Sequence, residues 1–202
     1  MGQVINALKI GFEGDGKTPI DPEQAAGLKI TTIQTLGELN IHEEVNVAAG
    51  YAWAMRRIGK VPIDDFLTES YMHTLHTKCF GDVWLWAGTQ RRVETSIGIA
   101  PERISNELRQ WLENLRFQST LDNCNHDEIA AELHYRIVRI HPYPNGNGRT
   151  SRIMAELYLK KVGRPIFSWG DSLGTQRRSA YISALREADA GRRGPLQAFV
   201  RS

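Results

Sequence analysis

The sequence has few cysteines, almost no net charge and no long apolar run. Only Cys79 and Cys124 are present, too few for a disulfide framework, so we expect a reducing, cytoplasmic environment. Lysine plus arginine number 25 and aspartate plus glutamate 23, and this balance gives no basic stripe for direct nucleic-acid binding. No apolar run approaches the roughly 18 residues of a membrane span, and the start lacks a signal-peptide pattern. We therefore expect neither membrane nor nucleic-acid partners.

The overall composition is typical of a folded domain. The 202 residues are 41% hydrophobic and 24% charged, close to the globular average, and the length suits one domain with an appended segment. The first forty residues are rich in glycine and proline and show little periodicity. We predict an irregular amino-terminal arm over residues 1–40, which is a candidate regulatory segment, and a helical domain over 41–202.

Apolar residues recur at steps of three and four along most of the chain, which is typical of amphipathic helices. The clearest stripe, behind Pro101, consists of Ile104, Leu108, Trp111, Leu112 and Leu115. The same pattern, with acidic starts and glycine stops, predicts further helices over residues 43–59, 64–79, 127–140, 149–162, 175–190 and 195–200. Residues 91–99 instead alternate like a short hairpin. The predicted fold class is therefore mainly α.

One candidate phosphate loop lies in the arm. Residues 11–18 match the G-x-x-x-x-G-K-[ST] pattern of a P-loop, with Lys17 as its lysine, after an apolar stretch that could form a strand. A P-loop aims backbone amides and a helix amino terminus at phosphate, but here Pro22 removes an amide donor and Glu13 and Asp15 would face the anion. The remaining chain also lacks the alternating strands and helices of a parallel sheet. A P-loop NTPase is thus the weaker alternative.

A second candidate loop lies between two predicted helices, in the segment IHPYPNGNGRTSR over residues 140–152. Gly146 and Gly148 permit positive φ and close approach of the backbone, so consecutive amides can form an anion site at a helix amino terminus. Arg149 and Arg152 share one face of that helix. The amino-terminal end of a helix is positive and therefore disfavours cations. Two arginines at this end indicate that an anion such as a polyphosphate binds between them. His141 supplies the nearby group with a pKa suited to proton transfer.

These residues carry a resemblance to a known family. The segment resembles the Fic signature H-P-F-x-[D/E/N]-G-N-G-R-x-x-R, and Tyr143 in place of Phe is its only departure. Residues 84–88 resemble the family's W-x-W-A-G stretch and residues 178–185 its R-x-x-Y-x-x-x-L stretch. His134 also lies at a family-like spacing before the loop. The likeness covers about residues 66–199 and extends to the small Fic proteins known as mobile mystery protein B.

The resemblance implies a Fic-type helical bundle that transfers AMP from ATP to a Ser, Thr or Tyr hydroxyl of a target protein. His141 would be the general base, Arg149 and Arg152 would hold the outer phosphates, and Asn145 would occupy the position of a Mg²⁺ ligand. The residues that would bind the α-phosphate follow directly: Gly146, Asn147 and Gly148. A neutral amide binds Mg²⁺ less well than a carboxylate. Related Doc kinases carry Lys at position 148, so phosphate transfer is disfavoured.

The resemblance also suggests roles outside the loop. Arg91 to Ile99 would form a β-hairpin flap along which the target protein docks by strand addition. Tyr181 would stack on the adenine. Many Fic proteins are restrained by a helix whose glutamate pairs with the second arginine, here Arg152, and Glu38 is our candidate for that glutamate. A separate antitoxin protein would be the other source of restraint. A catalytically restrained nucleotide-binding regulator remains the alternative function.

His73, His76 and Cys79 invite a zinc interpretation. Their spacing spreads them over about 300° of a helix, so the three side chains cannot share one metal ion. We therefore expect them to be packing residues.

Overall fold

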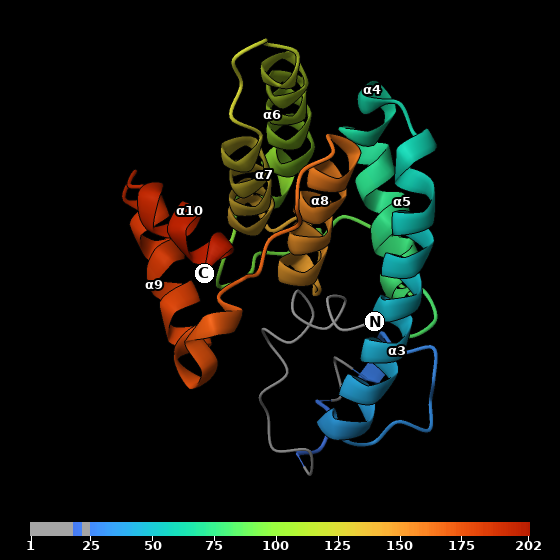
Figure 1. Cartoon of the computed structure of the whole chain (residues 1–202). Helices are drawn as coiled ribbons and strands as arrows, with labels where there is room; N and C mark the ends of the chain where they lie inside the picture. Colours follow the sequence, from blue (N-terminus) through green and yellow to red (C-terminus); the bar gives the residue numbers. More distant parts are fainter. Residues whose placement is uncertain (1–17, 22–24) are drawn as a thin grey trace.

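The computed structural model describes residues 18–21 and 25–202 and is mainly helical (Figure 1). Its α-helices are α3 (Leu36–Arg57), α4 (Ile63–Phe66), α5 (Glu69–Phe80), α6 (Ile104–Ser119), α7 (His126–Ile140), α8 (Asn147–Lys161), α9 (Arg177–Asp189) and α10 (Gly194–Arg201). Short 3₁₀ turns cover Ile58–Lys60, Pro101–Arg103 and Asp171–Gln176. The mainly α prediction is therefore confirmed. None of the described helices is long and apolar enough to cross a membrane.

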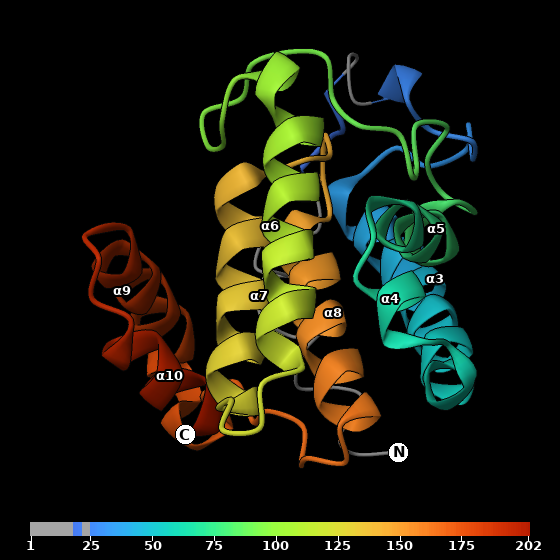
Figure 2. The same ribbon diagram turned by 90° about the horizontal axis from the view of Figure 1, so that it is seen from above.

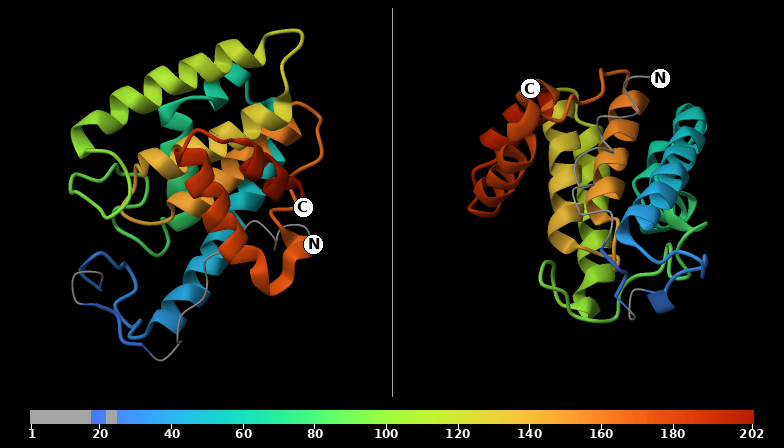
Figure 3. Two further views of the ribbon diagram at one scale, coloured as in Figure 1. Left: turned by 90° about the vertical axis from the view of Figure 1, so that its left-hand side faces the viewer. Right: turned by 90° about the horizontal axis from the view of Figure 1, so that it is seen from below.

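Helices α7 and α8 lie side by side at the centre of the bundle (Figures 1 and 2). Helix α6 packs on α7, α3 and α5 pack together on the α8 side, and α9 and α10 lie on the side of α7. Figure 3 shows the first turns of α3 extending past the neighbouring helices. Because α7 and α8 are consecutive and central, the loop that joins them is held by the whole bundle.

Helix α3 begins seven residues before the predicted start at Glu43. Thr35 and Glu38 form a capping box, in which the Glu38 amide donates to Thr35 Oγ1 and the Glu38 carboxylate accepts from the Thr35 amide at 3.2 Å. The two hydrogen bonds of the capping box outweigh the low helix propensity of Gly37. The sequence prediction places Gly37 in the irregular arm. The proposed boundary at residue 40 consequently lies inside a helix.

The other predicted helices are present, with one division. The stretch predicted as one helix over 64–79 is divided into α4 and α5, because the Thr68 hydroxyl caps a new helix by accepting from the Tyr71 amide at 3.1 Å. The apolar stripe of α6 is buried as predicted, except that Trp111 is only partly buried against the core. Helices α7, α8, α9 and α10 begin and end within about two residues of the predicted limits.

The predicted hairpin flap over Arg91 to Ile99 is wrong. No strand occurs among residues 18–21 and 25–202, and 91–99 is an irregular loop. The backbone amides at its two ends donate to the end of α7 and the segment after it: the Arg91 amide donates to the Pro142 carbonyl at 2.9 Å and the Ile99 amide to the Ile140 carbonyl at 3.4 Å. The buried Arg91 side chain occupies the interior of the loop and takes the carbonyls that a strand ladder would use.

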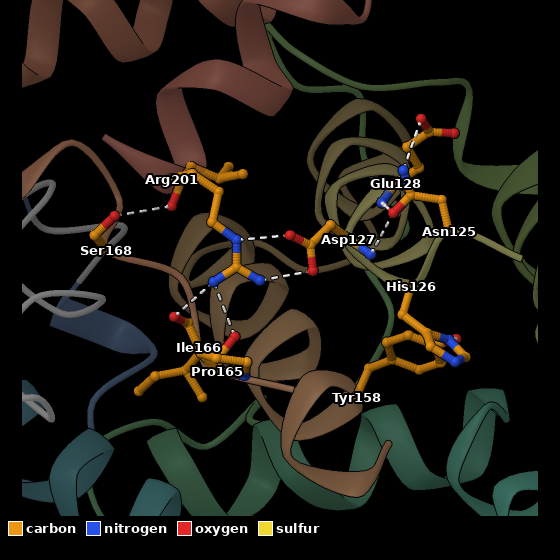
Figure 4. Close-up of polar contacts among 10 residues, drawn as sticks. Asn125, His126, Asp127, Glu128, Tyr158, Pro165, Ile166, Ser168 and Arg201 are labelled. Carbon is orange, nitrogen blue, oxygen red and sulfur yellow. Dashed lines mark hydrogen bonds and ion pairs between the residues drawn. The ribbon is translucent and has the colours of Figure 1, made fainter. Parts of the chain in front are cut away.

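The carboxyl-terminal helix is tied to the start of α7 (Figure 4). The Arg201 guanidinium donates to both carboxylate oxygens of Asp127 at 2.6 and 2.7 Å and to the carbonyls of Pro165 and Ile166. The Asn125 side chain caps α7 at the same end. These contacts fix the helices that flank α7, and hence the position of α7 itself.

Candidate active site

The loop between α7 and α8 turns through two left-handed residues. His141 ends α7 with φ 55°, and Gly146 begins α8 with φ 79°. A Cβ atom at position 146 would lie 2.5 Å from the Phe80 ring, so both the backbone conformation and the close approach require glycine. The amides of the first turn of α8 have no acceptor within their own helix, and they lie at its positive end. The turn therefore places a helix amino terminus, an end that favours anions, a short loop after His141.

The side chain of Asn147 fixes the backbone of the loop between α7 and α8. Its Oδ1 accepts from the Tyr143 amide at 2.9 Å, and its Nδ2 donates to the Tyr143 carbonyl at 2.7 Å. This two-point contact is buried, so it fixes the path of the chain between His141 and Gly146. Because the Asn147 side chain is used in this way, its contact with an anion would come from its backbone amide.

His141 has the tautomer that a general base needs. Its Nδ1 lies 3.3 Å from the Val138 carbonyl, and because a carbonyl only accepts, Nδ1 carries the proton. In the neutral ring Nε2 is then the lone-pair nitrogen. Burial lowers the pKa of His141, the bond to Val138 raises it, and the charge of Arg91 lowers it. The neutral form is thereby favoured near neutral pH.

A cavity of about 360 Å³ lies over this loop. It is lined by side chains from α3, the α7–α8 loop, α8 and α9, namely Asn40, Glu43, His141, Pro144, Asn145, Gly146, Asn147, Gly148, Arg149, Arg152, Arg178, Tyr181 and Ile182. The cavity thus brings together all the residues that the sequence singled out as candidates for catalysis and nucleotide binding. Glu38 is not among its lining residues.

Comparison with known proteins shows to which family this loop and its cavity belong. Residues 66–159 match the Fic/DOC family, and they include α5, α7 and the whole of the α7–α8 loop. The chain contains a Fic domain. The family resemblance expected from the sequence is confirmed.

Curated relatives of this Fic domain are named protein adenylyltransferases. The protein adenylyltransferase fic-1 of Caenorhabditis elegans is 30% identical over 147 residues, 70% of this chain and 26% of that protein. The protein adenylyltransferase Fic of Drosophila melanogaster is 30% identical over 167 residues, 78% of this chain and 32% of that protein. The chain therefore spans about a quarter to a third of the length of these curated relatives.

Solved structures share the fold. A Fic domain containing signaling protein from Bacteroides thetaiotaomicron has a TM-score of 0.70 at 19% identity, over 98% of this chain and 80% of that chain. The BepC protein of Bartonella tribocorum, solved with bound AMPPNP, has a TM-score of 0.65 at 18% identity, over 96% of each chain. At these identities the likeness shows the Fic fold alone.

The two arginines near the start of α8 have different surroundings. Arg149 Nη1 lies 2.6 Å from Glu43 Oε2, and its guanidinium lies 4.7 Å above the centre of the Phe80 ring. Arg152 is only 2% exposed, and its guanidinium lies 5.9 Å from the centre of the Tyr181 ring. One turn further along α8, Glu156 adds a buried acid whose pKa is raised to about 7, chiefly by burial. Along α8, two arginines are thus followed by one buried acid.

Sequence reasoning missed Glu43. Its second oxygen accepts from Trp84 Nε1 at 2.6 Å, so this carboxylate of α3 bonds to both the W-x-W-A-G stretch and Arg149 of α8. The carboxylate of Glu38, by contrast, accepts from backbone amides at the start of its own helix and is fully exposed. Glu43 lies four residues before buried Val47, and a charged residue on the buried face of a helix was the signal that could have found it.

Tyr181 reaches the cavity from α9 but is largely buried. Its hydroxyl lies 3.2 Å from Nε2 of His134, whose Nδ1 lies 2.9 Å from the Ser151 hydroxyl. Its ring lies against Phe199 of α10, with centroids 5.5 Å apart. Tyr181 therefore combines a place in the packed core with one edge at the cavity.

Helix α5 contacts the α7–α8 loop through the His76 side chain. The Gly88 amide donates to His76 Nδ1 at 2.9 Å, so the proton of His76 is on Nε2, which donates to the Asn145 carbonyl at 3.1 Å. The ring is stacked on Tyr143, and burial lowers its pKa to about 3. In the part of the chain that the structure describes, no group of three or more His, Cys, Asp or Glu side chains is placed to hold a metal ion. His76 and Cys79 are buried, as expected of packing residues.

The P-loop-like pattern at residues 11–18, with Lys17, lies outside the described residues except for Thr18. The described residues contain no parallel sheet of the kind that a P-loop NTPase requires.

Proposed function

We propose that this chain transfers the AMP moiety of ATP to a hydroxyl side chain of a target protein and releases pyrophosphate. The single observation that carries the proposal is the geometry of the α7–α8 loop, in which a histidine with a lone pair on Nε2 stands beside a glycine helix start and two arginines. The naming of the relatives as protein adenylyltransferases supports the same activity.

In the proposed reaction, His141 Nε2 takes the proton of the target hydroxyl. The hydroxyl oxygen forms a bond to the α-phosphorus while the bond from that phosphorus to the pyrophosphate oxygen breaks. The amides of Asn147 and Gly148 would hold the α-phosphate, joined by that of Gly146 once it leaves Asn145 Oδ1, and Arg149 and Arg152 would hold the departing phosphates. Phosphoryl-type transfer depends on such positioning and charge stabilisation. Tyr181 would contact the adenine with the edge that reaches the cavity.

Asn145 is the proposed ligand for Mg²⁺, which would neutralise phosphate charge. It offers one amide oxygen, and that oxygen also accepts from the Gly146 amide. This fits an ion held mainly by ATP phosphates and water, as Mg²⁺ usually is, with only a weak contribution from the chain.

Two further proposals concern access to the cavity. The target protein would dock along the irregular loop over 91–99, whose Val93 and Ile97 are exposed apolar side chains. The restraint that the resemblance led us to assign to Glu38 is better supplied by Glu43, because Glu43 already bonds to a phosphate-binding arginine. The partner arginine is Arg149 instead of Arg152. An internal acid in this position also makes a separate antitoxin unnecessary for restraint.

Labelled ATP tests the activity. We expect label at the α-phosphate, and not at the γ-phosphate, to become attached to protein in a host lysate, and we expect His141→Ala to abolish the transfer. Saturable ATP binding without transfer would favour the restrained regulator instead. Release of γ-phosphate that is lost in Lys17→Ala but kept in His141→Ala would favour a P-loop NTPase.

A further inference from the structure

Arg91 is a buried arginine outside the known signature, with 2% of its surface exposed. Its guanidinium donates to four carbonyl oxygens: His141 from Nε at 2.6 Å, Val93 from Nη1 at 2.8 Å, Ile140 from Nη2 at 3.4 Å, and Ile99, also from Nη2. One side chain therefore joins both ends of the loop over 91–99 to the turn that carries His141.

The acceptors explain why a charge is stable at this buried place. Two of them, Ile140 and His141, are the last carbonyls of α7, where the helix dipole is negative and a cation is favourable. His141 itself has a left-handed backbone, which costs a non-glycine residue about 1 kcal/mol or more unless its surroundings hold it. Arg91 binds the carbonyl of that strained residue directly.

Close packing makes the arrangement specific. A Cβ atom at Gly98 would lie 2.7 Å from both Arg91 Nη2 and His141 Cβ. The loop can thus cover the histidine only because position 98 has no side chain. The same guanidinium therefore fixes two things: the loop along which a target hydroxyl would dock, and the histidine that would accept its proton.

We propose that Arg91 is a positioning residue that fixes the His141 turn and the docking loop as one unit. The inference rests on the proposed function, in which His141 accepts a proton from a hydroxyl docked along that loop. A fork of five donors is needed for it, because four carbonyls in different directions cannot all be served by the single ammonium group of lysine.

Arg91 also acts on His141 electrostatically, since its charge lowers the pKa of the imidazole. The charged groups that line the cavity with His141 are Glu43, Arg149, Arg152 and Arg178. With Arg91 neutralised, the pKa of His141 moves upward toward the ordinary value of about 6.5. A base works only when neutral, so the acid limb of the rate profile then moves to higher pH.

The experiment compares Arg91→Met, Arg91→Lys and the control Arg103→Met, in which an exposed arginine paired with Glu107 loses its charge. The pKa of His141 is followed by NMR of histidine-labelled protein. The values of kcat and KM for ATP are measured with the protein that the labelled-ATP test in host lysate identifies as the target. Arg91→Met is expected to raise the pKa and to lower kcat about 10- to 100-fold, with KM for ATP unchanged. Arg91→Lys should keep the pKa and still lower kcat. Arg103→Met should change neither.

The outcomes separate this inference from the proposed function. Wild-type pKa and kcat in Arg91→Met would overturn it. If that variant does not fold, wild-type kcat in Arg91→Lys overturns it and a reduced kcat supports it. If the wild-type chain transfers no AMP, the proposed function fails, and the NMR titration of His141 in the variants still decides whether Arg91 controls the histidine.

Discussion

The contact between Glu43 and Arg149 predicts that this chain binds ATP less tightly than its loop allows. The carboxylate oxygen is 2.6 Å from the guanidinium, at the place where a phosphate oxygen would bind. Replacing Glu43 with glutamine removes the negative charge but keeps an oxygen for Trp84 Nε1, so the buried indole keeps its partner. We expect Glu43→Gln to bind ATP more tightly and to transfer AMP faster.

The size of the effect follows from burial. The exposed fractions of the two side chains are 4% for Glu43 and 11% for Arg149, so water and salt screen the pair little. A hydrogen bond between charged groups contributes about 1.5–3 kcal/mol, and about 1.4 kcal/mol corresponds to a tenfold change in an equilibrium constant. If phosphate has to displace the carboxylate, the affinity for ATP rises about 10- to 100-fold in Glu43→Gln.

Calorimetric titration with AMPPNP measures this directly, because no turnover interferes. Glu44→Gln is the matched control, since Glu44 is the exposed neighbour of Glu43 on α3. Glu38→Gln tests the earlier regulatory hypothesis and should leave the affinity unchanged. Equal affinities in the wild type and Glu43→Gln would refute the reasoning, as would a gain of similar size in Glu38→Gln.

Three further changes have defined outcomes. Gly146→Ala places a Cβ atom 2.5 Å from the Phe80 ring at a positive φ, so we expect nucleotide binding to fall at least tenfold in calorimetry, and wild-type affinity would contradict this. Asn145→Asp should lower the Mg²⁺ concentration that gives half-maximal transfer, because a carboxylate is the harder ligand; an unchanged requirement would remove Asn145 as the metal position. Hydrogen bonding to Arg201 lowers the pKa of Asp127, so this pair stabilises the fold above the unfolded pKa of about 3.9 and the gain is lost as the pH falls through the folded pKa. Asp127→Asn should therefore cost about 0.5–1 kcal/mol in denaturant unfolding at neutral pH and little in acid; an equal cost at both would contradict the assignment.

Local patterns were sufficient for most of the helices and for the central loop. The stripe of α6 is predictable because one buried face repeats along a single helix. The turn between α7 and α8 is predictable because its glycines and the arginines that follow are close in sequence, and each would serve the anion of the proposed function. The start of α3 was missed because Gly37 obscured a capping box formed by Thr35 and Glu38.

Contacts between distant segments could not be predicted in this way. Glu43 and Arg149 are 106 positions apart, and nothing in the sequence specifies which acid meets which arginine. The alternation over 91–99 suggested a hairpin, yet strands need partners for their ladder bonds, and here Arg91 supplies the loop's carbonyls with donors. Period-two alternation alone does not distinguish a strand from a loop closed around a buried side chain.

The central claim is that the loop after α7 binds the triphosphate of ATP beside His141. A crystal structure of the chain with AMPPNP and Mg²⁺ tests it most directly. We predict the α-phosphate at the amides of residues 146–148, the outer phosphates at Arg149 and Arg152, and the contact between Glu43 and Arg149 broken. Nucleotide bound elsewhere, with that contact intact and His141 Nε2 turned away from the phosphate, would contradict it.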